Sequence, residues 1–277
     1  MSRRNNQMFA LAGPPPETIA LTGCRYQLLR VFKHDFFAAT CLYESLDTGG
    51  GKVVVKFGRT TQFCGLPLGW AGRAMRRKEE SIYRVLAGLG GVPRWIGRVG
   101  VTGYAIEYIE GAPLNHVSAP PEGFFDRLVE LMEGIHARGV AYCDANKRSN
   151  ILIGPDGRAY LVDFQISLRR RDGLPWPWNV ITRAVVRYMA ARDIYHIYKH
   201  KRRMCPERLT PQERALSRRR SGLHLLHRKL TKPWRALRRK FLRRQYESGL
   251  LVSPTAEIED HDQPEKATWR PLKEPKT

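Results

Sequence analysis

Three side chains that carry carboxylate or amide oxygens lie beside two short strand candidates in the middle of the chain. Asp144 and Asn150 precede the run 151–153, and Asp163 follows the run 159–162. A Pro-Asp-Gly turn joins the two runs as a hairpin, so we expect the three side chains at one end of it. Hard cations such as Mg²⁺ prefer oxygen ligands, and phosphate oxygens can complete the set. The alternative is that the two aspartates only cap local turns.

A lysine upstream stands near the end of another strand candidate. In the run 53–57, Lys56 lies among β-branched and aromatic residues. An ammonium group that is half-buried on such a strand needs a carboxylate partner, and the following helix candidate offers Glu79 and Glu80. Such a pair is usually solvated when it stands alone. Its place in the chain, ahead of the two aspartates, favours a functional role.

An antiparallel meander followed by helices is predicted to position these residues. Alternation and turn signals predict strands over 26–31, 36–44, 52–57 and 104–109. Helical spacing of apolar residues predicts helices over 73–89 and 124–138, with Gly139 as the C-cap of the second. A sheet that comes first and helices that follow make the order α+β.

In this order the motifs resemble the protein-kinase-like fold, and in particular the Rio-type kinases and the bacterial lipopolysaccharide sugar kinases. The resemblance covers about residues 24–200, and the matches are as follows: V-A-I-K by Val53-Val54-Val55-Lys56, the helix glutamate by Glu79, H-R-D-x-x-x-x-N by Tyr142 to Asn150, D-F-G by Asp163-Phe164-Gln165, and the interlobe hinge by Glu107 to Gly111. It implies a bilobal fold with a β-rich N-lobe and a reduced helical C-lobe.

The resemblance also implies phosphoryl transfer from ATP with Mg²⁺, which depends on positioning and charge neutralisation. Lys56 would hold the α- and β-phosphates, and Glu79 would orient it. Asp144 would accept the proton of the attacking hydroxyl. Asp163 would bind Mg²⁺, with Asn150 as a second ligand. Glu107 and Ile109 would meet adenine.

Several departures from the family pattern bear on activity. The turn over 32–36 contains no glycine, so backbone amides would approach phosphate less closely; Lys33 is a candidate donor there, or an exposed turn lysine. Cys143 replaces the arginine of H-R-D, and it is better explained as a packed cysteine than as a redox thiol. Asn150 lies six residues after Asp144, so Asn146 is a rival metal ligand. Gln165 follows Asp-Phe and no A-P-E segment follows, which predicts little regulatory movement.

Composition limits the class of protein. The 277 residues include 48 Lys or Arg and 26 Asp or Glu, a net charge of +22, and 42% are hydrophobic. These values argue against a wholly disordered chain and against an integral membrane protein, and no run approaches the ~18 apolar residues of a membrane span. Five scattered cysteines without C-x-x-C spacing argue against a disulfide framework or a zinc site and favour a cytoplasmic location.

Much of the positive charge is concentrated late in the chain. Between Lys199 and Tyr246, eighteen Lys or Arg residues stand against two acidic residues, and they alternate with leucines and Trp234. Three roles are open for this segment: a helix docked on the C-lobe, contact with an anionic membrane or glycolipid, and nucleic-acid binding. The leucines and tryptophan favour lipid.

We therefore predict five parts of the chain and an enzyme. The parts are a loose leader over 1–20, an N-lobe over 21–110, a C-lobe over 111–205, a basic amphipathic helical extension over 206–250 and a disordered tail over 251–277. The predicted activity is that of an ATP-dependent kinase acting on a protein Ser/Thr or an envelope sugar or lipid, in the cytoplasm or peripherally on the inner face of the membrane. The alternative is a non-catalytic scaffold that binds nucleotide weakly and a polyanion through the basic segment.

Overall fold

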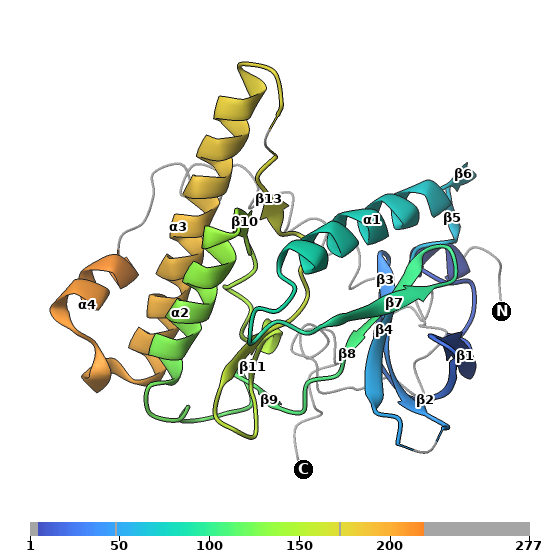
Figure 1. Ribbon diagram of the computed structural model, residues 1–277, viewed down its shortest axis with the longest axis horizontal. Coiled ribbons are helices and arrows are strands. Elements are labelled where there is room, and N and C mark those ends of the chain that lie inside the picture. The colour runs from blue at the N-terminus through green and yellow to red at the C-terminus, as the bar shows by residue number, and fades with distance from the viewer. Residues whose placement is uncertain (1–4, 48, 172, 219–277) are drawn as a thin grey trace, which may run out of the picture. The chain divides into compact units, whose positions relative to one another are not determined.

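The computed structural model describes residues 5–47, 49–171 and 173–218, which form two compact units (Figure 1). Unit 1 contains the described residues up to Arg76 together with Ile96–Tyr108, and unit 2 contains Arg77–Trp95 and the described residues from Ile109 onward. Helix α1 (Gly69–Val85) contributes residues to both units. Within these described ranges, no helix has both the length and the apolar character that crossing a bilayer requires.

Unit 1 is built on an antiparallel sheet. Its described strands follow the order β1-β2-β3-β4-β8-β7, with these bounds: β1 Thr18–Leu21, β2 Cys24–His34, β3 Ala38–Ser45, β4 Lys52–Gly58, β7 Trp95–Val99 and β8 Gly103–Glu107. A small hairpin, β5 (Gln62–Phe63) with β6 (Leu66–Pro67), and the 3₁₀ turn η1 (Asn5–Met8) complete the unit. The four predicted strands correspond to β2, β3, β4 and β8, so the predicted meander is confirmed.

The core of the sheet follows from alternation along its central strands. Val31, Cys41, Tyr43, Val55 and Ala105 are completely buried. Because side chains of a strand alternate between the two faces, these residues collect on the face that packs.

Residues 5–20, which we expected to belong to a loose leader, are instead held against the sheet. Strand β1 pairs with β2 in an antiparallel register. The guanidinium of Arg59, only 2% exposed, donates hydrogen bonds to the carbonyl oxygens of Gln7, Phe9 and Phe36. The prediction of a loose leader is corrected for these residues, because one arginine after β4 satisfies backbone carbonyls that lie about fifty residues earlier in the chain.

Unit 2 contains the helices and several short strand pairs. Helix α2 (Phe124–Ala137) buries Phe125, Leu128, Leu131, Met132 and Ile135, the face that the spacing predicts. The other elements are α3 (Trp178–Met204), α4 (Pro211–Arg218), β9 (Ala112–Pro113), β10 (Val140–Ala141), β11 (Ile151–Ile153), β12 (Ala159–Leu161), β13 (Leu168–Arg169) and the 3₁₀ turns η2 (Arg148–Asn150) and η3 (Pro206–Arg208). The predicted hairpin is β11 with β12, in the register that pairs Ile151 with Leu161.

The predicted extension over 206–250 is described as far as residue 218. In this part, α4 lies against α3 and is tied to it by an ion-pair network. The Lys201 ammonium contacts Glu213 at 2.7 Å and Asp126 at 2.9 Å. Because Asp126 is in the first turn of α2, this lysine joins three helices. The remainder of the predicted extension and the tail over 251–277 lie outside the described residues.

Candidate active site

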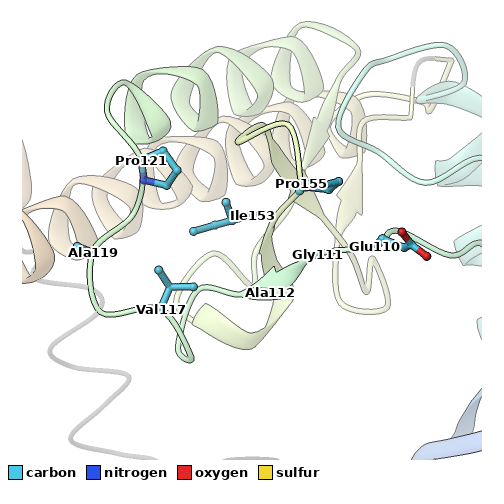
Figure 2. Close-up of a pocket in the computed structure, with 9 residues that line it drawn as sticks. Glu110, Gly111, Ala112, Val117, Ala119, Pro121, Ile153 and Pro155 are labelled. Carbon is cyan, nitrogen blue, oxygen red and sulfur yellow. The ribbon is translucent and has the colours of Figure 1, made fainter.

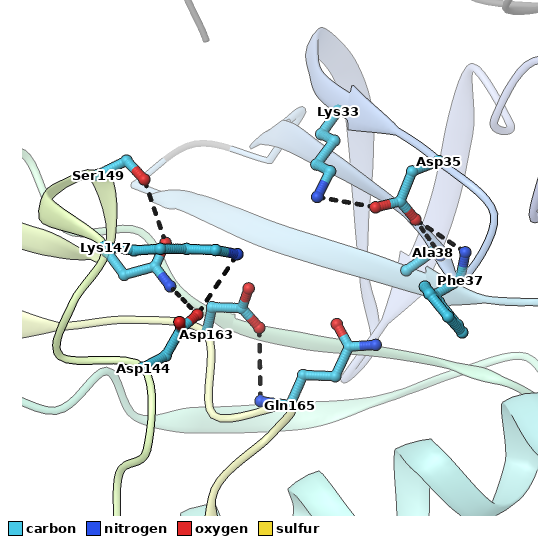
Figure 3. A network of polar contacts seen from close by, with 10 residues as sticks. Lys33, Asp35, Phe37, Ala38, Asp144, Lys147, Ser149, Asp163 and Gln165 are labelled. Atoms are coloured by element: carbon cyan, nitrogen blue, oxygen red, sulfur yellow. Dashed lines mark hydrogen bonds and ion pairs between the residues drawn. The ribbon is translucent and has the colours of Figure 1, made fainter. Parts of the chain in front are cut away.

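A hydrogen bond joins Asp144 to Asn150 in unit 2. Asp144 lies in the loop between β10 and η2, and its Oδ2 accepts a hydrogen bond of 2.8 Å from the amide nitrogen of Asn150. The Lys147 ammonium is 3.4 Å from the same oxygen (Figure 3). Backbone hydrogen bonds from Lys147 to the Asp144 carbonyl and from Asn150 to the Lys147 carbonyl wind the loop tightly. The structure therefore brings two of the predicted site residues together and adds Lys147, which sequence reasoning did not assign.

The end of the β11–β12 hairpin ties Asp163 to the same region. The N–H of Val162 donates a hydrogen bond of 3.1 Å to the carbonyl oxygen of Asn150. Val162 directly precedes Asp163 and Asn150 directly precedes β11, so this bond holds Asp163 near Asn150. Asp163 has a φ of +62°, a left-handed conformation that costs free energy for a non-glycine residue and is often found at functional sites. Phe164 is completely buried and fixes the chain immediately after Asp163.

Tyr142 lies beneath this arrangement as a neutral hydrogen-bond donor. Its hydroxyl donates to the carbonyl oxygen of Val162 at 2.5 Å, and its ring meets Phe164 edge-on at 5.1 Å between centroids. Burial, and then the negative charges of Asp163 and Asp144, raise the pKa of Tyr142 well above its ordinary value. The hydroxyl therefore stays protonated, and both carboxylates lie close enough to act on it.

Asp193 of α3 positions the loop and was missed by the sequence analysis. Its carboxylate is 1% exposed and accepts hydrogen bonds from the backbone N–H groups of Tyr142 at 2.8 Å and Cys143 at 2.9 Å. His136 Nε2 lies 3.1 Å from it. Burial raises the pKa of Asp193, an effect that the hydrogen bonds from His136, Tyr142 and Cys143 oppose. A usable signal existed: Asp193 is the sole acidic residue between Gly173 and Pro206.

The two asparagines of the loop have different partners. Asn146 Oδ1 accepts a hydrogen bond of 2.8 Å from the Lys199 ammonium on α3, whereas Asn150 contacts Asp144. Cys143 also sits in a left-handed conformation, with φ +68°. Burial raises the pKa of its thiol to about 12, which agrees with a packed cysteine and not with a reactive thiolate.

The remaining predicted residues are divided between the units. Lys56 lies on β4, opposite Thr40 and Tyr104 in the sheet register, and is 9% exposed. Glu79 lies in the unit 2 part of α1 and is 2% exposed. Because these two residues belong to different units, their pairing stays a prediction.

The two residues predicted to meet adenine are likewise divided between the units. Glu107 ends β8 in unit 1, Ile109 begins the next segment of unit 2, and both side chains are half-buried.

The turn after β2, which lacks glycine, is closed by the carboxylate of Asp35. Asp35 Oδ1 accepts hydrogen bonds from the backbone N–H groups of Phe37 at 2.8 Å and Ala38 at 3.0 Å, and Oδ2 lies 2.7 Å from the Lys33 ammonium (Figure 3). Burial raises the pKa of Asp35, but Lys33 and the two N–H groups outweigh that effect and lower it below the ordinary value. These amides and this lysine therefore already have an anionic partner within the turn.

The oxygen donors of unit 2 suit a cation that brings further ligands of its own. Among the residues of the described ranges, no group of three or more His, Cys, Asp or Glu side chains could hold a metal, so no all-protein cage is formed. Asp163 offers a carboxylate, and Asn150 offers a carbonyl oxygen because its amide nitrogen donates to Asp144. This small set fits Mg²⁺, which retains water and phosphate ligands and binds few protein groups.

An apolar cavity of about 440 Å³ lies elsewhere in unit 2 (Figure 2). Its walls come from the segment after Ile109, from the loop before α2 and from the β11–β12 hairpin, and they include Ala112, Val117, Pro121 and Ile153. Neither aspartate of the candidate active site lines it. The cavity is thus separate from the carboxylates of Asp144 and Asp163.

Similar chains are found among solved structures. No family model matches the chain, and no curated protein matches its sequence. Two similar solved structures are of the Rio2 kinase from Chaetomium thermophilum. One is 17% identical with a TM-score of 0.46, over 65% of this chain and 59% of that chain. The other, a complex with ADP, Mg²⁺ and phosphoaspartate, is 17% identical with a TM-score of 0.49, over 66% and 57%.

The matched part is thus less than two thirds of those chains. The fold follows from the element order: an antiparallel sheet with a helix after β4, then α2, a loop with Asp144 and Asn150, and a hairpin that ends before Asp163. This chain has a protein-kinase-like fold.

Proposed function

We propose that the protein is an ATP-dependent phosphotransferase that moves the γ-phosphoryl group to a hydroxyl acceptor. The observation that carries the proposal is the hydrogen-bonded pair Asp144–Asn150 at the end of the hairpin that leads into Asp163. Phosphoryl transfer needs little covalent chemistry from the protein and relies on oriented charges. A loop that is wound by its own backbone and anchored by Asp193 supplies that orientation.

Asp144 is the base in this proposal. It takes the proton of the acceptor hydroxyl as the new O–P bond forms and the bond between the γ-phosphorus and its bridging oxygen breaks, which releases ADP. Its orientation is fixed by Asn150, and the nearby Lys147 ammonium, 41% exposed, balances negative charge that develops on the transferring phosphoryl group.

The other residues hold the nucleotide. Asp163 and Asn150 would hold Mg²⁺, which when bound neutralises charge on the phosphates. Lys56, oriented by Glu79, would contact the α- and β-phosphates. Glu107 and Ile109 would contact adenine.

The acceptor and the location are also proposals. A Ser/Thr hydroxyl of a protein and a sugar hydroxyl of an envelope lipid both fit a site of this kind. A cytoplasmic protein that works peripherally at an anionic membrane surface is consistent with the net charge of +22. Nucleic acid is a less favoured partner, because the basic segment also carries leucines and a tryptophan.

The turn after β2 favours a second candidate, a non-catalytic scaffold that binds nucleotide weakly. Asp35 engages the N–H groups of Phe37 and Ala38 and the Lys33 ammonium. A phosphate that used these donors would have to displace a carboxylate with a lowered pKa. Lys33 would then contribute to nucleotide binding only after leaving Asp35.

One experiment separates the candidates. The protein is incubated with γ-labelled ATP and Mg²⁺ together with protein, envelope-lipid or RNA fractions, and label transfer is measured alongside binding of a fluorescent ATP analogue. We expect Asp163→Ala to lower transfer roughly 100-fold or more, because a lost charge contact in a site of this kind costs that much. The matched control is Asp156→Ala, which removes a half-exposed carboxylate from the turn of the same hairpin.

Two results would contradict the enzyme assignment. Transfer by Asp163→Ala within a few-fold of the wild-type rate would exclude the assigned role of Asp163. Nucleotide binding by a wild-type protein that labels no fraction would favour the scaffold. Lys56→Met, which keeps the length of the side chain and removes its charge, is expected to behave as Asp163→Ala does.

A further inference from the structure

The second half of helix α3 carries a line of three cationic side chains. Arg192, Lys199 and Arg203 are separated by seven and four residues, a spacing that puts them on one face of a helix with 100° per residue. Arg203 is exposed, and Arg192 and Lys199 are half-buried. At 1.5 Å per residue the three positions span about 16 Å of the helix axis. We call this line of Arg192, Lys199 and Arg203 the cationic face.

The cationic face lies beside the loop that carries Asp144. The Lys199 ammonium donates a hydrogen bond of 2.8 Å to Oδ1 of Asn146, two residues after Asp144. Burial raises the pKa of the Cys143 thiol, and the positive charge of Arg192 acts against that rise, so Arg192 lies near the residue that precedes Asp144. The face therefore passes the loop on both sides of the proposed base.

Arg148 of the loop adds to the same positive surface. It is exposed, as Arg203 is. Burial lowers the pKa of His200, whose Nε2 lies 3.0 Å from the carbonyl oxygen of Ala145, and the nearby charges of Lys199, Arg148 and Arg203 lower it further. Cations from the helix and from the loop thus gather around one point beneath the loop.

The one acidic residue of α3, Asp193, does not reach this surface. Its side chain is 1% exposed, and its oxygens accept hydrogen bonds from the backbone N–H groups of Tyr142 and Cys143. The helix therefore has no exposed carboxylate of its own. A surface on which one sign of charge collects attracts ligands of the opposite sign, so the cationic face favours an anionic ligand next to the loop.

We propose that the phosphoryl acceptor is a Ser or Thr residue in an acidic segment of a protein, and that this segment lies along the cationic face. The inference rests on the proposed phosphotransfer at Asp144 and names its substrate class. An extended peptide advances about 3.3 Å per residue, so about five residues cover the length of the face, with acidic side chains on both sides of the acceptor residue. A single sugar ring is too short to meet Arg192 and Arg203 at once.

The expected contribution of each contact is modest. An ion pair between exposed side chains is worth up to about a fivefold change in affinity, so recognition comes from several pairs together and weakens as salt is added. These pairs are already formed when the peptide binds and persist in the transition state. Their loss should therefore raise KM and leave kcat nearly unchanged.

The experiment uses the full chain and three serine peptides of equal length, in which Glu, Gln or Lys residues flank the serine. Transfer from γ-labelled ATP gives KM and kcat for each peptide. Fluorescence anisotropy measures the Kd of the Glu peptide, with its serine replaced by alanine, in the absence of nucleotide. We expect the Glu peptide to have the lowest KM. Lys199→Gln with Arg203→Gln should raise its KM and Kd about tenfold and change kcat by less than about twofold.

A matched pair of arginines on the same helix is the control. Arg183→Gln with Arg187→Gln removes two charges at the same spacing from exposed positions, about 160° around the helix from Lys199 and Arg203. This variant should keep the wild-type KM and Kd. Circular dichroism verifies that both double variants fold.

The binding arm separates this inference from the proposed function, because it needs no ATP. Binding of the Glu peptide through Lys199 and Arg203 without any label transfer would contradict the phosphotransferase and not the cationic face. The inference is overturned if the two double variants have the same KM and Kd, or if the three peptides are labelled equally well. It is also overturned if glucose 6-phosphate or an RNA oligonucleotide is labelled in a way that depends on Lys199 and Arg203 while the Glu peptide is not labelled.

Discussion

Acid should weaken the fold through His200, which lies beneath the loop of the candidate active site. His200 is 2% exposed, and its Nε2 lies 3.0 Å from the carbonyl oxygen of Ala145, the residue after Asp144. The other ring nitrogen, Nδ1, is buried without a hydrogen-bond partner. Burial lowers the pKa of His200 from 6.5 to about 4, and nearby Lys199, Arg148 and Arg203 lower it further, against the hydrogen bond to Ala145. The ring is therefore neutral at pH 7, with Nε2–H donating to Ala145.

The direction and size of the effect follow from these two pKa values. Because the unfolded chain binds the proton more readily, the free energy of unfolding falls as the pH falls from 6.5 toward about 4. One pKa unit corresponds to about 1.4 kcal/mol, so His200 alone accounts for a loss of about 3 kcal/mol across this window. This stability is fully present above pH 6.5, where neither state of the chain protonates the ring.

Urea denaturation at a series of pH values tests the prediction. His200→Gln keeps an N–H that can reach the Ala145 carbonyl and cannot become charged. We expect the stability of this variant to fall less steeply with acid than that of the wild type, by up to about 1.4 kcal/mol per pH unit. Carboxylates titrate in both proteins and cancel in the difference. His116→Gln, at an exposed histidine, is the matched control, and parallel curves for the wild type and His200→Gln would refute the reasoning.

Three further substitutions test the site and the fold. Asn150→Ala should raise the Mg²⁺ concentration needed for phosphotransfer. Asn146→Ala should not, because Asn146 contacts Lys199. A Mg²⁺ titration that reverses the two results would overturn the assignment of Asn150 as the metal ligand. Asp193→Ala should lower the free energy of unfolding by about 3 kcal/mol or more, since it leaves two buried N–H groups without an acceptor. It should also slow turnover more than Asp193→Asn does. Urea denaturation measures the first effect and steady-state kinetics the second. Arg59→Met should lower the free energy of unfolding by about 3 kcal/mol, because it leaves buried backbone carbonyls without a donor. It should also expose residues 5–20 to limited proteolysis, and unchanged protection would contradict the anchoring role.

The parts of the site that the sequence revealed are local in the chain. Asp144 and Asn150 are six residues apart, and a hairpin with a Pro-Asp-Gly turn brings Asp163 to the same end. Helix α2 was equally readable, because its buried face recurs at helical spacing over fourteen residues. In each case the residues that meet are joined by a short element of known geometry. Composition and spacing therefore carry enough information to place them.

The parts that the sequence did not reveal depend on contacts between remote residues. Asp193 binds the backbone of Tyr142 and Cys143 about fifty positions earlier, and Arg59 binds carbonyls about fifty positions before it. Backbone N–H and carbonyl groups occur at nearly every position, so the sequence gives no clue to which ones a buried charge will satisfy. Only the unusual composition around a residue, such as one acid in a basic helix, signals a role of this kind.

The two halves of helix α3 differ in what they contact. Its second half is fixed by buried polar groups, because Asp193 holds the loop before Asp144, His200 holds the residue after Asp144, and Lys201 joins α2 and α4. Its first half buries no side chain fully and exposes Trp178, Ile181 and Val185 to solvent. One continuous helix, α3, therefore carries both the exposed apolar residues and the buried polar residues that hold the loop around Asp144.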